Sequence, residues 1–228
     1  MNNYGLYNLA GSVAKLRGGT FTGRGGGATG SANGIHNYGT LYADAVAALG
    51  EDHTSDNFGL QNNLAGATAI LRDGTFVGRG GTNTCGIRNI AALTANDVTA
   101  LGENGGIGNY GLYNAGGTAA LRGGSYTGSG GSTGGGAFGI WNAATLAASD
   151  LTASGDNNLS SWGLYNQGTS ATITQATLAG MMSIVDTGVG PVDLSNSRLI
   201  GLLVVTPSVT CTAVSRLGVF AVGPACPP

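Results

Sequence analysis

Acidic side chains recur at matching places in this sequence and are the first candidates for chemistry. Glu51, Glu103 and Asp156 each follow a glycine in stretches that read alike, and Asp97 and Asp150 form a similar pair. A column of carboxylates can bind calcium or act as acid and base on a polysaccharide. Successive members stand 52 or 53 residues apart, which is two coils, or about 10 Å, if one coil takes about 25 residues. That distance is too long for a shared ion, so we predict solvated turn charges, no catalytic residue and no metal site.

Basic side chains and histidines are weaker candidates. An arginine follows an inward leucine in three similar stretches and is expected to point outward, at Arg17, Arg72 and Arg122. These cations could bind an anionic glycan, although solubility and turn capping are the simpler interpretation. His36 and His53 have no cysteine or paired acid at metal-ligand spacing. The glycine-rich stretches are not followed by a helix pattern, as phosphate-binding loops are, so no cofactor is predicted.

Planar side chains provide the strongest candidate for a binding or assembly edge. They dominate one outward position in seven successive units, at Tyr7, His36, Gln61, Arg88, Tyr113, Trp141 and Tyr165. Exposed aromatic groups on a flat sheet suit stacking against sugars or side-by-side packing of fibres. The alternative is that flanking loops fold over this edge and cover it.

A second outward pattern is rich in threonine. It consists of Thr20 and Thr22, Thr75 and Val77, and Ser125 and Thr127. An outward Thr-x-Thr array on a flat face resembles the faces of ice-binding solenoids. We expect Asp97 and Asp150 to interrupt this array, which counts against ice binding.

These positions recur because the chain is built from an internal repeat. The motif Gly-(Leu/Ile)-x-Asn starts at Gly5, Gly34, Gly59, Gly86, Gly111, Gly139 and Gly163. Long and short units alternate, so every second copy recurs after 54, 52 and 52 residues. Short apolar–polar alternations between turn residues indicate strands rather than helices. The sequence predicts an all-β fold, a single parallel β-solenoid of about 8–9 coils with about 25–27 residues in each coil.

Strand alternation assigns these side chains to faces. One inward row is predicted to contain Leu6, Ile35, Leu60, Ile87, Leu112, Ile140 and Leu164. A second inward row is predicted at Tyr4, Phe58, Tyr110, Phe138 and Trp162, with Asn33 and Cys85 at the two remaining steps. We interpret Cys85 as a small buried apolar side chain.

The asparagine of each motif explains why the motif repeats. A side-chain amide at a turn can donate to the equivalent amide of the next coil and also bind local backbone groups. Such a ladder needs asparagine in one register, at Asn8, Asn37, Asn62, Asn89, Asn114, Asn142 and Asn166. The glycine of the motif is expected to give the backbone room beside this ladder.

With these features the sequence resembles the right-handed parallel β-helix superfamily, the pectate-lyase-like fold with an internal asparagine ladder, from Tyr4 to about Ile200. The short GIxN and GLYN units are also similar to those of bacterial surface and autotransporter passenger proteins. Right-handedness is implied by the resemblance alone. A fold-level resemblance implies an architecture and not an activity.

Composition narrows the classes of partner. The chain has 228 residues, 44 glycines, 9% charged residues and a net charge of −2, which gives no electrostatic reason to expect nucleic acid. No apolar run is long enough for a membrane helix, so no membrane insertion is predicted. The first residues lack a signal-peptide pattern and lie within a repeat unit, so we interpret Met1 as the start of an expressed fragment or a mature segment.

The C-terminal segment is predicted to differ from the repeats. We place the solenoid at residues 1–205 and a cap at residues 206–228, closed by a disulfide between Cys211 and Cys226. Such a loop would stabilise the fold by about 3 kcal/mol. A disulfide implies an oxidising environment, so the predicted location is extracellular or at the cell surface.

The sequence therefore favours a non-enzymatic structural or adhesive module that stacks into a fibre, and it leaves an enzymatic role open. The predicted partners are copies of itself or a surface glycan. The alternative is a glycan-binding or glycan-cleaving module of the phage tail-spike or polysaccharide-lyase kind, and a third interpretation is an ice-binding protein.

Overall fold

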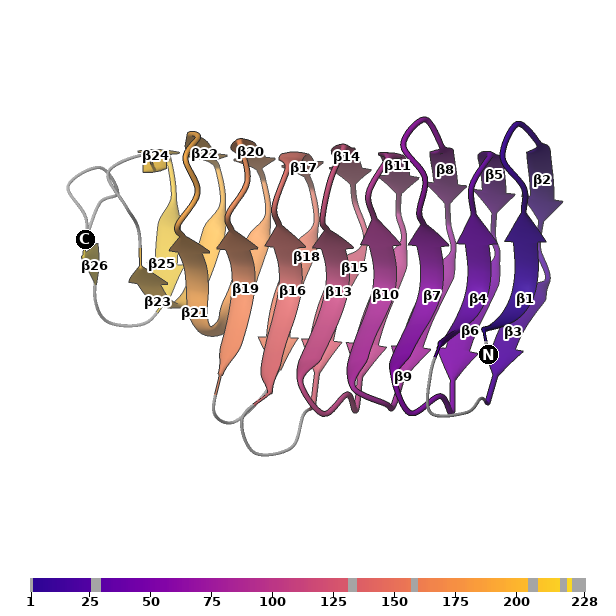
Figure 1. The fold of residues 1–228 in the computed structure, drawn as a ribbon. Helices are drawn as coiled ribbons and strands as arrows, with labels where there is room; N and C mark the ends of the chain where they lie inside the picture. The colour runs from indigo at the N-terminus through magenta and orange to yellow at the C-terminus, as the bar shows by residue number, and fades with distance from the viewer. Residues whose placement is uncertain are drawn as a thin grey trace.

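The computed structural model describes residues 2–25, 30–130, 135–156, 160–204, 209–217 and 221–222. Over these residues the chain forms β-strands and no helix, and it winds into a parallel β-solenoid whose coils stack along one axis (Figure 1). The predicted kind of fold is confirmed. Six coils, β1 to β18, consist of three separate strands each, and β19 to β26 continue the stack less regularly. The regular part is thus shorter than the 8–9 coils predicted.

Each regular coil contributes one strand to each of three parallel ladders. The first ladder begins with β1 (Asn3–Asn8), β4 (Ser31–Asn37), β7 (Asp56–Asn62), β10 (Asn83–Asn89), β13 (Gly108–Asn114), β16 (Gly136–Asn142) and β19 (Ser161–Asn166). The second contains β2 (Val13–Arg17), β5 (Thr40–Asp44), β8 (Thr68–Arg72), β11 (Ala92–Asn96), β14 (Thr118–Arg122), β17 (Thr145–Ser149), β20 (Ser170–Thr174), β22 (Val192–Ser195) and β24 (Val209–Thr212). The third begins with β3 (Thr20–Arg24), β6 (Ala47–Glu51), β9 (Thr75–Arg79), β12 (Thr99–Glu103), β15 (Ser125–Ser129) and β18 (Thr152–Asp156).

The stack becomes irregular where the turn between the third and first ladders is lost. Strand β21 (Thr177–Asp186) pairs with β18 through its first residues and with β19 through its last. Strand β23 (Arg198–Val204) follows β21 with register shifts. The last strands are β25 (Ser215–Leu217) and β26 (Ala221–Val222). Because this turn is missing, the single strand β21 belongs to both ladders. The Gly-(Leu/Ile)-x-Asn motif can no longer be followed from this point on.

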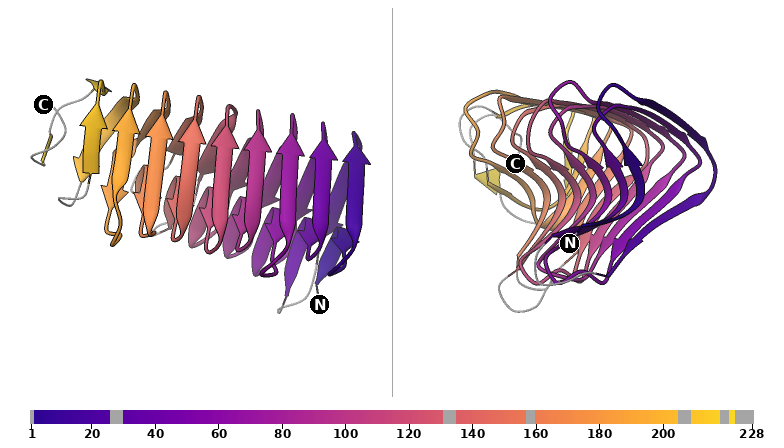
Figure 2. Two further views of the ribbon diagram at one scale, coloured as in Figure 1. Left: turned by 90° about the horizontal axis from the view of Figure 1, so that it is seen from above. Right: turned by 45° about the vertical axis from the view of Figure 1, so that its right-hand side comes forward.

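The cross-section of the solenoid is wide at one end and narrow at the other (Figure 2). The wide end holds the apolar core, because inward side chains of all three ladders meet there. The predicted leucine and isoleucine row lies in this core and is fully buried from Ile35 to Leu164. Phe76 and Tyr126 of the third ladder fill the space opposite this row. The core is therefore a continuous apolar column along the axis.

The narrow end is held together by glycine instead. A Cβ atom on Gly111 would lie 2.3 Å from the backbone nitrogen of Thr127, and one on Gly128 would lie 2.2 Å from the carbonyl oxygen of Asn109. Equivalent glycines recur in every coil, at Gly5, Gly34, Gly59, Gly86, Gly139 and Gly163 on the first ladder and Gly23, Gly50, Gly78, Gly102 and Gly155 on the third. The two ladders thus touch backbone to backbone, without side chains between them. We call this contact the glycine seam. It is the main role of the motif glycine, which was expected to make room beside the asparagine ladder.

The seam also changes the direction of side chains along each first-ladder strand. The missing Cβ of Gly111 points toward the third ladder, and its neighbour Leu112 also points inward. Two successive inward positions indicate a local irregularity of the bulge type, since side chains of a regular strand alternate. Tyr110 and Tyr113 consequently lie on the same side, with ring centroids 5.2 Å apart, and the equivalent rings of Tyr4 and Tyr7 are 5.0 Å apart.

The predicted second inward row does not belong to the apolar core. Tyr4, Tyr110, Phe138 and Trp162 contact rings of the predicted outward edge and therefore face the same way as that edge. Asn33 and Phe58 occupy the same register but are buried. Strict alternation failed because the prediction ignored the irregularity at glycine. Cys85 is nevertheless buried, as predicted, and burial raises the pKa of its thiol well above the usual range.

The asparagine ladder is confirmed at all seven positions. Each Nδ2 donates to the Oδ1 of the next asparagine over 2.7–2.9 Å, from Asn8 through to Asn166. The amide of Asn166 then donates to Asp186, which extends the ladder by one step that the sequence did not reveal. The same amide groups bind backbone carbonyls of their own and the next coil, as Asn37 does with Gly39 and Thr68. The asparagine side chains thus stabilise the turn that follows each strand of the first ladder.

The predicted cap is only partly described. Strands β24 and β25 lie in it and continue the second and third ladders. Cys211 lies in β24, whereas Cys226 is outside the described residues, so the disulfide stays a prediction. In the part of the chain that the structure describes, no helix is long and apolar enough to span a membrane.

Candidate binding surfaces

The predicted edge of planar side chains forms a continuous row on the outer face of the first ladder. Parallel pairing places each member directly beside the next, from Tyr7 beside His36 to Trp141 beside Tyr165. The second row, from Tyr4 to Trp162, runs alongside it on the same face. We call these two rows together the aromatic strip.

Rings in the strip contact one another in two blocks. The first contains Tyr4, Tyr7 and His36 and is extended by Tyr38, which follows β4 outside the two rows. The second contains Tyr110, Tyr113, Phe138, Trp141, Trp162 and Tyr165. In the second block, Phe138 stacks face to face on Tyr110 at 5.0 Å and on Trp162 at 4.4 Å. Phe138 is therefore stacked between the other two rings, and these contacts restrain the row that lies behind the predicted edge.

The predicted edge is the more accessible of the two rows. Trp141 is tilted by 63° against Tyr113 and by 57° against Tyr165, so these rings do not cover one another's faces. The three residues are half-buried, and Tyr7 is 43% exposed. His36 and Gln61 are buried, so the accessible edge has a gap that the sequence did not predict.

His36 is held in an apolar setting. Its ring stacks on Tyr38 at 4.6 Å and meets the edges of Tyr4 and Tyr7. Burial, and secondarily the nearby Arg88 cation, lowers the pKa of His36 to about 4. His36 is therefore neutral at pH 7 and belongs to the aromatic block rather than to a proton-transfer site.

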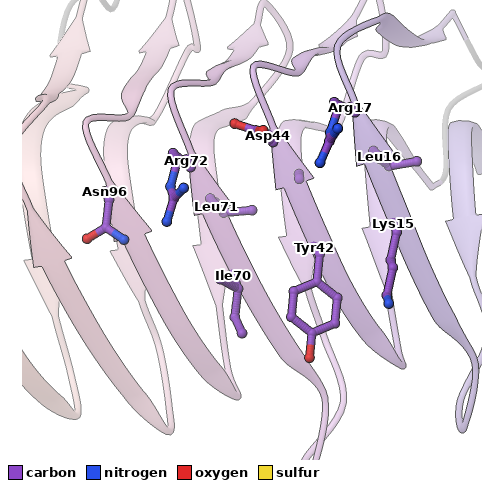
Figure 3. Close-up of a pocket in the computed structure, with 10 residues that line it drawn as sticks. Lys15, Leu16, Arg17, Tyr42, Asp44, Ile70, Leu71, Arg72 and Asn96 are labelled. Atoms are coloured by element: carbon purple, nitrogen blue, oxygen red, sulfur yellow. The ribbon is translucent and has the colours of Figure 1, made fainter.

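The outer face of the second ladder carries a hollow that was not predicted. Its volume is about 650 Å³, and its lining comes from β2, β5, β8 and β11 (Figure 3). Tyr42 stands at its centre with 42% exposure, between Lys15 and Ile70 of the neighbouring strands. The Lys15 ammonium lies 5.9 Å from the centre of the Tyr42 ring. Arg17, Asp44, Arg72 and Asn96 form a second row above them. We call this site the Tyr42 hollow.

Two columns of arginine on the outer faces differ in their pairing, and only the column at Arg17, Arg72 and Arg122 was predicted to point outward. Arg24 and Arg79 end strands of the third ladder and form ion pairs with Glu51. Arg79 also pairs with Glu103. The alternation of long and short units therefore produces an alternation of cation and anion over the first four strands of this ladder, and the alternation ends at Ser129 of β15. The predicted turn charges Glu51 and Glu103 are thus paired with arginine rather than merely solvated.

Arg17, Arg72 and Arg122 behave differently. Their in-register neighbours are Asp44, Asn96 and Ser149, and within the described residues no ion pair of these arginines is found. The sequence indicated this difference. The strand-end positions in register with these arginines on the second ladder include one acidic residue, whereas the equivalent positions of the third ladder include several.

Of the other predicted turn charges, Asp97 and Asp150 occupy turns, whereas Asp156 ends strand β18. Asp73, Asp97 and Asp150 follow the second ladder with positive φ angles of 48°, 52° and 57°, a backbone region that aspartate tolerates better than most residues. Among the described residues, no three potential metal-binding side chains cluster.

Asp97 and Asp150 also lie outside the threonine array, since Thr99 and Thr152 continue that array in the short units. The short units therefore do interrupt the array, but with Ala47, Leu49 and Leu101 and not with aspartate as expected.

Sequence reasoning missed two polar features. Asn57 and Asn109 are fully buried beside the glycine seam and bind backbone carbonyls of the adjoining turns, including Gly80 and Gly130. Tyr42 and Lys15 were also missed, because each occurs in a single unit and repeats nowhere.

No model of a protein family, no curated protein and no solved structure matches this chain.

Proposed function

We propose that this protein is a structural and adhesive β-solenoid of the extracellular space or cell surface, which binds neutral glycan chains along its aromatic strip without acting on them. Membership in the right-handed parallel β-helix superfamily, and kinship with bacterial passenger proteins, belong to the same proposal. What supports the fold-level part is the asparagine ladder and the three-ladder coil.

The observation that carries the binding proposal is the row Tyr113, Trp141 and Tyr165. These rings occupy three successive coils and are backed by the stacked rings of Tyr110, Phe138 and Trp162. An aromatic platform that is already rigid loses little conformational entropy when a ligand binds. The strand spacing of about 4.8 Å is close to the advance per residue of an extended hexose chain, so each ring can meet one sugar.

A solid-phase binding assay with immobilised β-1,4-mannan tests this function. We expect the chain to bind, and we expect Trp141→Ala to weaken binding at least about tenfold, which corresponds to about 1.4 kcal/mol. Tyr7→Ala should weaken binding less, because Tyr7 lies in the other block of the strip.

Val13→Ala is the control, since Val13 is 61% exposed and lies on the second ladder, outside both the strip and the lining of the Tyr42 hollow. Equal losses for the Tyr7, Val13 and Trp141 variants would contradict a binding role of the strip, as would the absence of binding to any of a panel of neutral glycans.

Self-association into a fibre is a second candidate. Successive coils pair in register through parallel strands over the described part of the solenoid. Coils of the same register in different copies could pair in the same way, which favours stacking of copies along the axis. Light scattering and negative-stain electron microscopy of the purified chain should then show filaments that lengthen end to end, and discrete monomers would contradict this candidate.

Ice binding also gains one supporting observation. The outward threonine array continues through Thr99 and Thr152 in the short units, although Ala47, Leu49 and Leu101 replace threonine at some positions. Thermal hysteresis that is lost in Thr99→Lys would support it, and a freezing point equal to that of buffer would contradict it.

A further inference from the structure

The Tyr42 hollow is distinct from the aromatic strip in position and in chemistry. It lies on the second ladder, whereas the strip lies on the first. Its side chains combine an exposed ring and an apolar residue with cations. Binding at the hollow can therefore be tested separately from binding at the strip.

The charge of the hollow is opposite to that of the whole chain. Lys15, Arg17 and Arg72 contribute three positive charges and Asp44 one negative charge, which leaves +2 in a chain of net charge −2. All three cations are exposed. Exposed cations without an ion-pair partner can bind an anion without first losing one.

The geometry of the hollow favours a chain rather than a single small anion. Arg17 and Arg72 are separated by the strand that carries Asp44, and therefore by two strand spacings or about 10 Å. Tyr42 and Ile70 present an apolar surface beside this row (Figure 3). A ligand with ring bodies and regularly spaced negative groups would contact both the apolar surface and the cations.

We propose that the Tyr42 hollow binds an anionic sugar chain, with a sugar ring on Tyr42 and carboxylate or sulfate groups at Lys15, Arg17 and Arg72. A carboxylated and a sulfated chain share this chemistry. Asp44 lies between the two arginines and weakens binding of any such chain by repulsion.

Calorimetric titration with β-1,4-hexamannuronate tests the proposal, with β-1,4-mannohexaose as the neutral probe of the same length and a sulfated mannohexaose as the second anionic probe. At low salt the hollow should bind an anionic hexamer, and the affinity should fall as salt rises. Arg72→Gln should lower the affinity about three- to fivefold, the size expected for one exposed charge contact.

Two variants make the test specific. Arg79→Gln removes the same charge from the same coil, but Arg79 ends the neighbouring strand β9 and pairs with Glu51 and Glu103. It should leave the affinity for hexamannuronate within about 1.5-fold of the original. Asp44→Asn should raise this affinity, a gain that a purely structural role would not produce.

Three outcomes would overturn the proposal. These are equal losses in the Arg72 and Arg79 variants, no gain in Asp44→Asn, and hexametaphosphate binding as tightly as the anionic sugars with no effect of Tyr42→Ala. The last result would make the hollow a nonspecific cationic patch. Failure of the strip is recognised separately, because mannohexaose then fails to bind while the anionic hexamers still do.

Discussion

Two adjacent residues in the middle of each first-ladder strand pack in opposite ways. At the narrow end, Gly111 lets two backbones touch and leaves no room for a Cβ atom. At the wide end, its neighbour Leu112 is fully buried among apolar side chains of all three ladders. An added side-chain atom at Gly111 would therefore disrupt the contact between the two backbones. A lost side-chain atom at its neighbour Leu112 would weaken the packing of the core. The same step in the backbone turns the aromatic rows outward.

The largest expected effect comes from adding a methyl group to the seam. Gly111→Ala should destabilise the fold by at least about 3 kcal/mol, at the upper end for overpacked sites, because the new Cβ meets backbone and not a flexible side chain. The three nearest atoms would lie only 2.3–2.6 Å away. Urea unfolding followed by circular dichroism measures the change.

Gly106→Ala is the control for this variant. Its nearest atom, the Gly81 oxygen, would lie 3.6 Å from the new Cβ, so the change should be within about 0.5 kcal/mol. Similar destabilisation of both variants would contradict the seam, because it would show that glycine acts there only through chain flexibility.

Removing atoms from the wide end should have the next largest effect. Leu112→Ala should cost about 3 kcal/mol through lost burial and the cavity that remains. Leu101, half-buried on the outer face of the third ladder, provides the comparison, and Leu101→Ala should cost less than about 1 kcal/mol. Equal costs in the same unfolding experiment would show that the apolar column is not the main core.

The asparagine ladder should respond in proportion to its broken hydrogen bonds. Asn89→Ala removes the acceptor of Asn62 and the donor to Asn114, and it leaves buried groups unpaired. We expect a loss of about 2–3 kcal/mol. Asn96→Ala, at a half-buried outward position, should change the free energy of unfolding by less than about 0.5 kcal/mol. A negligible effect of Asn89→Ala would mean that stacking of the strands alone holds this corner.

The smallest expected effect is a pH dependence of the free energy of unfolding, which tests whether His36 is buried and neutral on the outer face of the first ladder. The folded pKa of His36 is about 4, below the unfolded value of about 6.5. Between these values the unfolded chain binds more protons, so stability should rise with pH and be lost as pH falls toward 4. The part due to His36 should be about 2 kcal/mol between pH 7 and pH 5. His36→Phe should remove this part, and an unchanged pH dependence in that variant would contradict the buried, neutral state.

Much of this arrangement was predictable from the repeat. The asparagines and the inward leucines occur in every unit, and because parallel coils stack in register, one correct strand assignment fixes all the others. The outward edge from Tyr7 to Tyr165 was predictable for the same reason. The second aromatic row was assigned to the wrong face because residue patterning assumes strict alternation, whereas the contact at Gly5 and its equivalents shifts the alternation by one position.

The remaining features were not predictable because they occur once or depend on distances between ladders. Tyr42 and Lys15 follow no repeat, and the hollow exists only because their strands are adjacent. The pairing of Arg79 with Glu51 and Glu103 requires the coil register. Asp186 takes the place of asparagine in the ladder after the motif has ended.

Tryptophan emission during titration with β-1,4-mannohexaose tests the central claim most directly. The chain contains two tryptophans, and both Trp141 and Trp162 lie in the aromatic strip. If the strip is the surface that binds neutral glycans, saturable binding should change the emission, and the change should persist in Trp162→Phe and vanish in Trp141→Phe. Binding of mannohexaose with no change in tryptophan emission, or no binding at millimolar concentration, would contradict it.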